Sequence, residues 1–244
     1  MRFSVVIMES IYSQIVAAKA INQKLLALLI DPDKVAMDQV SVLIQKINTS
    51  PATHILVGGS SFDGDYLEDL IAKLKSEIEL PILLFPGNPS QISANANAIL
   101  FLMLLSGRNP EFLIEHQINA VPILKKTNLE VISTGYLLIE SGKETAVERV
   151  SKTKPLDRNN PEYVLQTAQA GEYLGNKLIY LEAGSGAKFP VPTDMITLVS
   201  QNIKIPVLVG GGIRSKNEIE AAFSAGADMV VIGTAFENDS NFFD

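Results

Sequence analysis

The stretch Val207-Leu-Val-Gly-Gly-Gly-Ile-Arg-Ser215, followed one helix length later by Asp228-Met-Val-Val-Ile-Gly-Thr234, decides the fold of this chain. Each part holds a short run of Val, Leu, Ile or Met that ends in glycine. Such continuously apolar runs are typical of parallel strands that are buried on both faces, and a crossover helix joins strands of this kind. The sequence therefore predicts repeated strand–helix units.

The glycines that end these two runs indicate an anion site. Because residues 210–212 have no Cβ, their backbone N–H groups can approach an anion, and Ser215 is placed to cap the next helix. Gly233 and Thr234 repeat the arrangement one unit later. Phosphate sites on (β/α)₈ barrels are commonly built from the loops after the last two strands, so we expect a phosphate here. Tight turns alone are the alternative explanation.

The rest of the chain continues the pattern. Apolar runs that end in polar or glycine-rich loops predict strands at residues 25–30, 54–57, 81–85, 98–105, 130–138 and 177–181. Helical spacing predicts helices at residues 9–22, 40–47, 65–78, 111–119 and 161–174, with a break near Pro122. No Gly-X-Gly-X-X-Gly follows the first strand, which argues against a dinucleotide-binding fold.

These elements favour a single (β/α)₈ TIM barrel domain over residues 1–244, because such barrels typically use about 250 residues. The N-terminal helix at 9–22 is expected to close the barrel floor. Residues 140–160 are polar and weakly periodic. A long segment of this kind inside a compact domain is usually a lid or a binding loop.

Composition excludes several classes of site. The chain is 47% hydrophobic with a net charge of −7, and no stretch gathers Lys and Arg with aromatics, so we expect no nucleic-acid surface. The absence of cysteine excludes disulfides and thiolate sites, and two histidines argue against a His-rich zinc site. Residues 1–8 are too short for a signal peptide and residues 98–105 too short to span a membrane, so a cytoplasmic protein is expected.

Reactive groups in such barrels cluster at the carboxyl ends of the strands. Asp31 follows the first expected strand, Ser60 follows the second, and Tyr180 and Glu182 lie at the sixth. A carboxylate and a hydroxyl oxygen on one rim suit a hard cation such as Mg²⁺, while the glycine backbone on the other rim suits a phosphate. Between these two rims, Glu182 is placed to take the proton of an attacking hydroxyl.

Each of these residues has a structural alternative. Asp31 also fits a turn, Ser60 a helix cap, Glu182 a salt bridge in the barrel mouth, and Tyr180 a core aromatic. Taken alone, the residues predict an enzyme that acts on two anionic substrates with a divalent metal. They leave the reaction open.

Segments spread over nearly the whole barrel resemble the geranylgeranylglyceryl phosphate synthase family, whose bacterial relatives use other polyprenyl chains. The most specific are Tyr180-Leu-Glu-Ala-Gly-Ser-Gly186 and Phe85-Pro-Gly-Asn-Pro-Ser-Gln-Ile92. The other family-like segments are Leu29-Ile-Asp-Pro-Asp-Lys34, Val57-Gly-Gly-Ser60, Ala98-Ile-Leu-Phe101, Ser106-Gly-Arg-Asn-Pro110, Val209-Gly-Gly-Gly-Ile-Arg214 and Ile232-Gly-Thr234.

The resemblance implies a Mg²⁺-dependent prenyltransferase. In this family, the 3-hydroxyl of sn-glycerol 1-phosphate attacks C1 of a polyprenyl diphosphate, with geranylgeranyl as the first candidate, and diphosphate leaves. Asp31 and Ser60 match the family's metal positions, and Glu182 and Tyr180 match its catalytic positions. The glycerol phosphate positions match Tyr180, Leu181, Glu182, Ala183, Gly184, Ser185, Gly186, Gly211, Gly212, Gly233 and Thr234.

One position departs from part of the family, and other features stay open. Leu29 stands where some members have a lysine, so Lys34 or Arg108 is the candidate for diphosphate contact. The prenyl tail is expected in an apolar groove beside the third and fourth strands and their helices. We also expect a homodimer and a transient membrane-surface contact for the lipid product. The rival functions are another phosphate-binding barrel isomerase and an inactive lipid-binding barrel.

Overall fold

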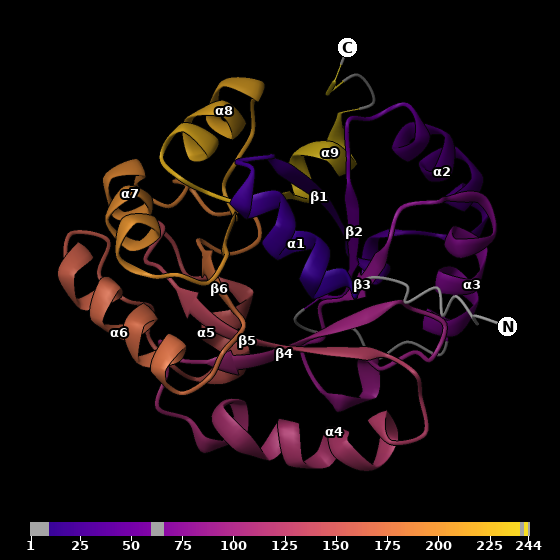
Figure 1. Cartoon of the computed structure of the whole chain (residues 1–244). Helices are drawn as coiled ribbons and strands as arrows, with labels where there is room; N and C mark the ends of the chain where they lie inside the picture. Colours follow the sequence, from indigo (N-terminus) through magenta and orange to yellow (C-terminus); the bar gives the residue numbers. More distant parts are fainter. Residues whose placement is uncertain (1–9, 60–65, 240–241, 244) are drawn as a thin grey trace, which may run out of the picture.

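The computed structural model describes residues 10–59, 66–239 and 242–243 and shows a closed barrel of eight parallel strands. The strands follow one another around the barrel in chain order, and β8 pairs with β1 to close it (Figure 1). The predicted (β/α)₈ barrel is thus confirmed. The strands are β1 (Leu25–Ile30), β2 (His54–Val57), β3 (Ile82–Leu84), β4 (Ala98–Leu104), β5 (Glu130–Leu138), β6 (Leu178–Glu182), β7 (Val207–Gly210) and β8 (Met229–Ile232).

Helices connect most of the strands and surround the barrel (Figure 1). Ser215 caps α8 as predicted, because its side chain accepts a hydrogen bond from the Glu218 N–H. No helix in the described part of the chain is long and apolar enough to cross a membrane. The α-helices are α1 (Ile11–Ala20), α2 (Val40–Asn48), α3 (Leu67–Glu77), α4 (His116–Leu124), α5 (Ala146–Ser151), α6 (Pro161–Tyr173), α7 (Thr193–Asn202), α8 (Lys216–Ser224) and α9 (Thr234–Asn238).

The connection between β3 and β4 departs from a regular barrel. Every other strand is followed by an α-helix, whereas the residues described here form only the 3-10 turn η3 (Pro89–Gln91). Pro86 and Pro89 lack an N–H and fix their φ angles, and Asn88 caps the short turn by accepting from the Ser90 N–H at 2.8 Å. The expectation that helices alternate with strands throughout is therefore wrong here, and this sector has no outer α-helix.

The expected helix break at Pro122 is also wrong. A π-helical turn, η4 (Glu111–Glu115), leads directly into α4, which continues through Pro122 to Leu124. Pro122 lies in the last turn of α4, so its missing N–H removes only one helical hydrogen bond. The loss falls next to the C-terminal end, where the last carbonyl groups have no intrahelical partner in any case.

Residues 140–160 are more ordered than a plain loop. They contain α5, whose N-terminus carries a capping box in which Thr145 and Glu148 bond to each other's backbone N–H. A single β-bridge between Ile139 and Leu156 ties the two ends of the segment together. Whether the segment moves as a lid stays a prediction.

Strand alternation divides the core into two layers. In β1, Leu25 and Ala27 face the barrel interior, whereas Leu26, Leu28 and Ile30 pack outward against the helices. Both faces of the strands are therefore buried, which explains why the sequence shows continuous apolar runs instead of alternation. Polar side chains are confined mainly to the strand ends.

Helix α1 closes the amino end of the barrel, as expected (Figure 1). The N–H groups of Ile11 and Tyr12 donate to the carboxylate of Glu130, the first residue of β5, at 2.6 and 3.0 Å. At the other end of α1, Lys19 forms a 2.8 Å ion pair with Asp228, which precedes β8. Fully buried Ile15 fills the floor between these polar anchors.

A buried histidine lies at the same end. His54 begins β2 and shares the inward face with Leu56. Its Nδ1 lies 2.9 Å from the Thr53 hydroxyl, while Nε2 has no hydrogen-bond partner among the described residues. Burial lowers the pKa of His54 to about 4, so the ring is neutral near pH 7.

This pKa predicts a loss of stability in acid. Below a pH of about 6.5 the unfolded chain takes up a proton on His54, whereas the folded chain resists protonation until about pH 4, so stability falls across that window. Removing the titration with His54→Leu should shrink the drop in unfolding free energy between about pH 7 and about pH 4 by roughly 3 kcal/mol. Urea unfolding at both pH values measures the unfolding free energy of wild type and variant. His116→Leu controls for the loss of one histidine, and an equal drop in wild type and His54→Leu would contradict the prediction.

Candidate active site

A cavity of about 610 Å³ opens at the carboxyl ends of the strands. We call it the rim cavity. Residues at the ends of β1, β6, β7 and β8 line it, together with part of the α5 segment. The structure thus brings most of the predicted site residues together in one space. Those that line the rim cavity are Asp31, Tyr180, Glu182, Gly184, Ser185, Gly186, Gly211, Gly212, Gly233 and Thr234.

One side of the rim cavity is made of backbone. We call the main chain of residues 184–186, 211–212 and 233–234 the glycine nest. The hydroxyls of Ser185 and Thr234 lie 3.4 Å apart and join its two edges. Four of its glycines have positive φ angles, which side-chain-bearing residues rarely adopt: Gly184 (94°), Gly186 (64°), Gly211 (79°) and Gly212 (72°). Such turns aim backbone N–H groups into one concavity that suits an anion.

Glu182 lies beneath this nest. Its side chain is buried, and its Oε1 accepts a 2.6 Å hydrogen bond from the Gly184 N–H. A Cβ on Gly211 would collide with the same oxygen, and one on Gly210 would come within 3.0 Å of Oε2. Glycine at both positions is therefore needed to leave room for the carboxylate and for a ligand above it.

No ion pair compensates the charge of Glu182 among the described residues, so the salt-bridge alternative is not supported. Burial raises the pKa of Glu182 to about 7, against the opposing effects of the Tyr180 hydroxyl and the Gly184 N–H. A carboxylate with a pKa near 7 can take or give a proton at neutral pH.

Three aromatic rings lie beside this carboxylate. Tyr180 stacks at tilted or edge angles against Phe85 and Tyr136, with ring centroids 5.4 and 5.5 Å away. Tyr180 is fully buried, so it is a core aromatic as well as a cavity residue. Burial raises the pKa of Tyr180 well above the usual value, and the nearby Glu182 carboxylate raises it further. The neutral phenol thus lies at the bottom of the cavity beside Glu182.

The opposite side of the rim cavity is ionic. Asp31 caps the turn after β1 by accepting from the Asp33 N–H, so the cap alternative also holds. Lys34 lies 3.3 Å from the Asp31 carboxylate and 3.0 Å from that of Glu237 in α9. The oxygen ligands here suit Mg²⁺, although no cluster of three potential metal ligands occurs among the described residues. Asp31 and Glu237 are therefore placed to hold a cation whose remaining ligands would come from water or substrate.

Some predicted site residues lie elsewhere. Ser60 falls outside the described residues, directly after Gly59 of the rim cavity. Leu181 and Ala183 pack outward, because they alternate with Tyr180 and Glu182 along one strand. Their side chains do not line the cavity, so a contact of Leu181 or Ala183 with a substrate would have to come from the backbone and stays a prediction.

Arg108, one of the two candidates for diphosphate contact, does not line the rim cavity. Its guanidinium donates to the carbonyl oxygens of Leu105 and Gly107 at 2.9 and 2.7 Å. Lys34, the other candidate, does line it. The structure therefore favours Lys34.

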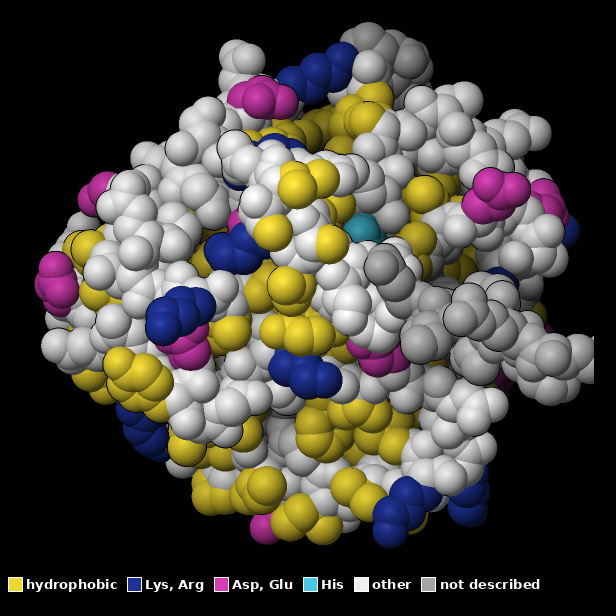
Figure 2. Space-filling view, viewed as in Figure 1, with side chains coloured by type: hydrophobic (Ala, Val, Ile, Leu, Met, Phe, Trp, Pro, Cys, Tyr) yellow, Lys and Arg dark blue, Asp and Glu magenta, His cyan; other side chains and the backbone are white. Residues whose placement is uncertain are grey.

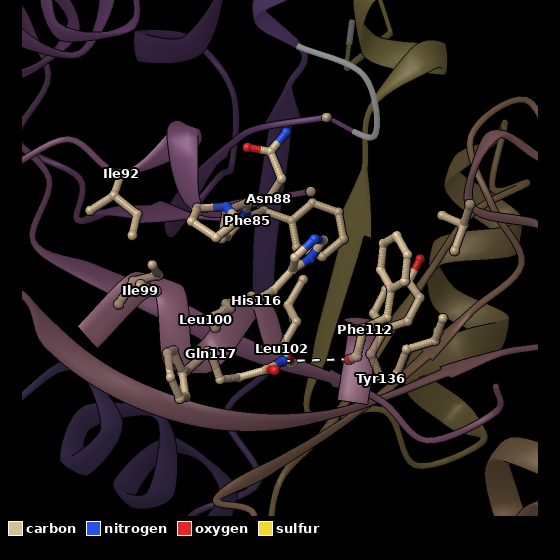
Figure 3. Close-up of a pocket in the computed structure, with 18 of the residues that line it drawn as sticks. Phe85, Asn88, Ile92, Ile99, Leu100, Leu102, Phe112, His116, Gln117 and Tyr136 are labelled. Carbon is tan, nitrogen blue, oxygen red and sulfur yellow. Dashed lines mark hydrogen bonds between the residues drawn. The ribbon is translucent and has the colours of Figure 1, made fainter. Parts of the chain in front are cut away.

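An apolar groove opens from the rim cavity. It runs beside β3 and β4, as expected, under the sector that has no outer α-helix (Figure 3). Four residues line both spaces and so make them continuous: Gly59, Phe85, Tyr136 and Val147. Side chains that line only the groove include Ile92, Ile99, Leu100, Leu102, Phe112, His116, Gln117 and Ala120. The groove is suited to an apolar chain whose polar end lies in the rim cavity.

Sequence reasoning missed several residues of the rim cavity. Lys143 and Arg149 come from the α5 segment, Glu237 from the last helix, and Tyr136 from β5. Tyr136 follows from strand alternation, because it pairs with Tyr180 in register. No local pattern singles out Lys143 or Arg149 within the polar segment 140–160, which the sequence predicts only as a lid or a binding loop.

Comparison with known proteins agrees with this geometry. The family model described as the PcrB family matches residues 18–243. The chain is 65% identical over 238 residues to a geranylgeranylglyceryl phosphate synthase of Flavobacterium johnsoniae, covering 98% of each chain. It is 50% identical to the enzyme of the same name from Zunongwangia profunda, covering 95% of this chain and 98% of that one.

A solved structure is similar throughout. The (S)-3-O-geranylgeranylglyceryl phosphate synthase of Thermoplasma acidophilum, crystallised in complex with its substrate sn-glycerol-1-phosphate, superposes with a TM-score of 0.90 at 33% identity. The match covers 97% of this chain and 95% of that one. The chain therefore belongs to the geranylgeranylglyceryl phosphate synthase family, which the PcrB family model describes, and is a prenyltransferase.

Proposed function

We propose that this enzyme joins the 3-hydroxyl of sn-glycerol 1-phosphate to C1 of a polyprenyl diphosphate, with geranylgeranyl as the first candidate. The observation that carries the proposal is the position of one buried carboxylate, Glu182, directly beneath a backbone anion nest and in the same cavity as Asp31. The bound glycerol phosphate of the Thermoplasma relative supports the choice of acceptor.

The glycine nest would hold the phosphate of the acceptor. Backbone N–H groups bind an anion without a charged side chain, which suits a chain with a net charge of −7. The hydroxyls of Ser185 and Thr234 add donors at its edge. An acceptor held this way presents its glycerol end toward Glu182.

Glu182 would act as the general base. As the acceptor's 3-oxygen forms a bond to C1, its proton passes to the Glu182 carboxylate, and the C1–oxygen bond to diphosphate breaks with its electron pair. A pKa of about 7 makes Glu182 a sufficient base near neutral pH while its ionised form stays available. The ring faces of Phe85, Tyr136 and Tyr180 would stabilise positive charge that develops at the allylic C1.

Asp31 would hold Mg²⁺, and Ser60 is the proposed second ligand from the next strand end. A bound Mg²⁺ would bind the diphosphate and neutralise its charge as it leaves. Lys34 lies close enough to the same carboxylate to contact the diphosphate as well. Residues 140–160 would form a binding segment over the cavity, and residues 1–244 one functional unit.

The apolar groove would hold the prenyl tail. Burying one CH₂ is worth about 0.8 kcal/mol, so a long chain binds firmly without charged contacts. Hydrophobic side chains gather along α4, the helix that forms one wall of the groove (Figure 2). Ile114, Ile118 and Val121 are exposed there, and we place the transient membrane contact on this face.

Asp31→Ala tests the metal role. We expect turnover of sn-glycerol 1-phosphate and geranylgeranyl diphosphate to fall by about a hundredfold or more, because the diphosphate would lose its cation. A radiolabelled product assay at limiting and saturating Mg²⁺ measures it, with Asp33→Ala as the matched loss of charge outside the cavity. Near-normal turnover of Asp31→Ala at limiting Mg²⁺ would refute the role. No product from wild type would favour one of the rival functions.

Glu182→Gln tests the base. The rate should fall by about a hundredfold or more, while the dissociation constant for sn-glycerol 1-phosphate changes little, because the amide is isosteric but cannot take the proton. In wild type, kcat/KM should rise with pH through a midpoint near the pKa of about 7, and the variant should lack that limb. Steady-state kinetics and calorimetry check both. Equal losses in rate and binding would argue against a base.

Ala120→Phe tests the groove. The side chain of Ala120 is buried in α4 and lines the groove, so a phenyl ring there should fill part of it. The KM for geranylgeranyl diphosphate should rise by about tenfold, while the KM for sn-glycerol 1-phosphate stays constant. Ala221→Phe on exposed α8 is the control. Unchanged preference among diphosphates of different chain length would place the tail elsewhere.

A further inference from the structure

We propose that Lys143 is a phosphate-binding residue that covers the glycine nest and sets the affinity for the acceptor's phosphate. The inference rests on the proposed function, because it assigns a further residue to the same phosphate. Lys143 lies in the segment between β5 and α5 and lines the rim cavity. The Lys143 Nζ lies 3.3 Å from the position that a Cβ atom on Gly186 would occupy.

Contacts on both sides hold the backbone of Lys143 in place. Gly142 lies against the Phe189 ring, where any Cβ would come within 2.8 Å of a ring carbon. The N–H groups of Lys188 and Phe189 donate to the Ser141 carbonyl at 3.2 and 3.1 Å. The position before Lys143 is thus fixed by the loop that follows the nest.

On the other side, Thr145 packs on the nest itself. Its methyl group fills the space that a Cβ on Gly184 would need, and its hydroxyl caps α5. Contacts at Gly142 and Thr145 thus flank Lys143 on both sides. Between them, the Lys143 side chain lies over Gly186.

The charges around the cavity point the same way. Lys34 is neutralised by Asp31 and Glu237, and Arg214 donates its guanidinium to the carbonyl oxygens of Ala187 and Lys188. Lys143, in contrast, has no ion-pair or hydrogen-bond partner within the described structure, although Glu144 follows it. The side chain of Arg149, which also lines the cavity, has no such partner there either, but only Lys143 lies against Gly186. An unpaired ammonium above converging backbone N–H groups adds a full positive charge to a site built from partial ones.

This arrangement explains how a chain with a net charge of −7 holds a dianionic phosphate near the carboxylate of Glu182. The N–H groups of the glycine nest would orient the phosphate, and Lys143 would add a positive charge at the open side of the nest. Because Lys143 is exposed to solvent, its attraction for the phosphate should be screened by salt.

The test compares Lys143→Met and Lys143→Arg with the full-length wild type and with Lys126→Met, which removes the same charge on an exposed surface beyond α4. Calorimetry with sn-glycerol 1-phosphate alone should give a dissociation constant about tenfold higher for Lys143→Met, and within about threefold of wild type for Lys143→Arg. Raising NaCl from about 50 to about 300 mM should weaken binding more in wild type than in Lys143→Met.

Kinetics separate this role from others. The KM for sn-glycerol 1-phosphate should rise in Lys143→Met by the same factor as the dissociation constant, with kcat and the KM for geranylgeranyl diphosphate unchanged, because the contact is equal in the ground and transition states. If wild type binds the acceptor and makes product but Lys143→Met binds equally well, or if only the diphosphate KM changes, Lys143 does not bind the acceptor's phosphate. If wild type fails to bind the acceptor at all, the proposed function itself fails.

Discussion

The burial of the Glu182 carboxylate beneath backbone that has no side chains constrains the whole site. A buried carboxylate needs either a counter-charge or hydrogen bonds, and here it has one N–H from Gly184 and no ion pair among the described residues. The space that it needs exists only because positions 210 and 211 are glycine. The same missing side chains open the anion nest above it. One structural requirement therefore links the buried carboxylate to the concave backbone above it.

The dipoles and charged side chains around the rim cavity differ between its two sides. Backbone dipoles and Lys143 lie on the side of β6 and β7, while Asp31, Lys34 and Glu237 lie on the side of β1 and α9. Barrel closure brings the end of β1, near the start of the chain, beside the ends of β6, β7 and β8. We propose that one anion binds to the backbone dipoles and Lys143, and that the other binds beside Asp31 and Glu237 only through a bound cation, because Lys34 alone does not balance two carboxylates.

The sequence allowed much of this to be predicted, and the failures have physical reasons. Continuous apolar runs place all eight strands, since burial on both faces leaves little else. Strand alternation predicts that the side chains of Leu181 and Ala183 point outward, because Tyr180 and Glu182 face the interior. The missing helix after β3 is harder to predict. The prolines indicate a break, but they do not show that no other helix forms in this connection. The sequence predicts the polar segment that holds Lys143 as a lid or a binding loop, but no local pattern singles out Lys143 within it, and Glu237 is placed by tertiary contacts alone.

The absent helix after β3 changes how a long substrate can enter. In a fully covered barrel, a chain bound at the rim must thread lengthwise through an end of the fold, and its length is limited by the depth of that passage. Here the wall is open along its side, where the sector holds only the turn at Pro89–Gln91. For the proposed polyprenyl substrate, this opening would allow entry from the side of the barrel.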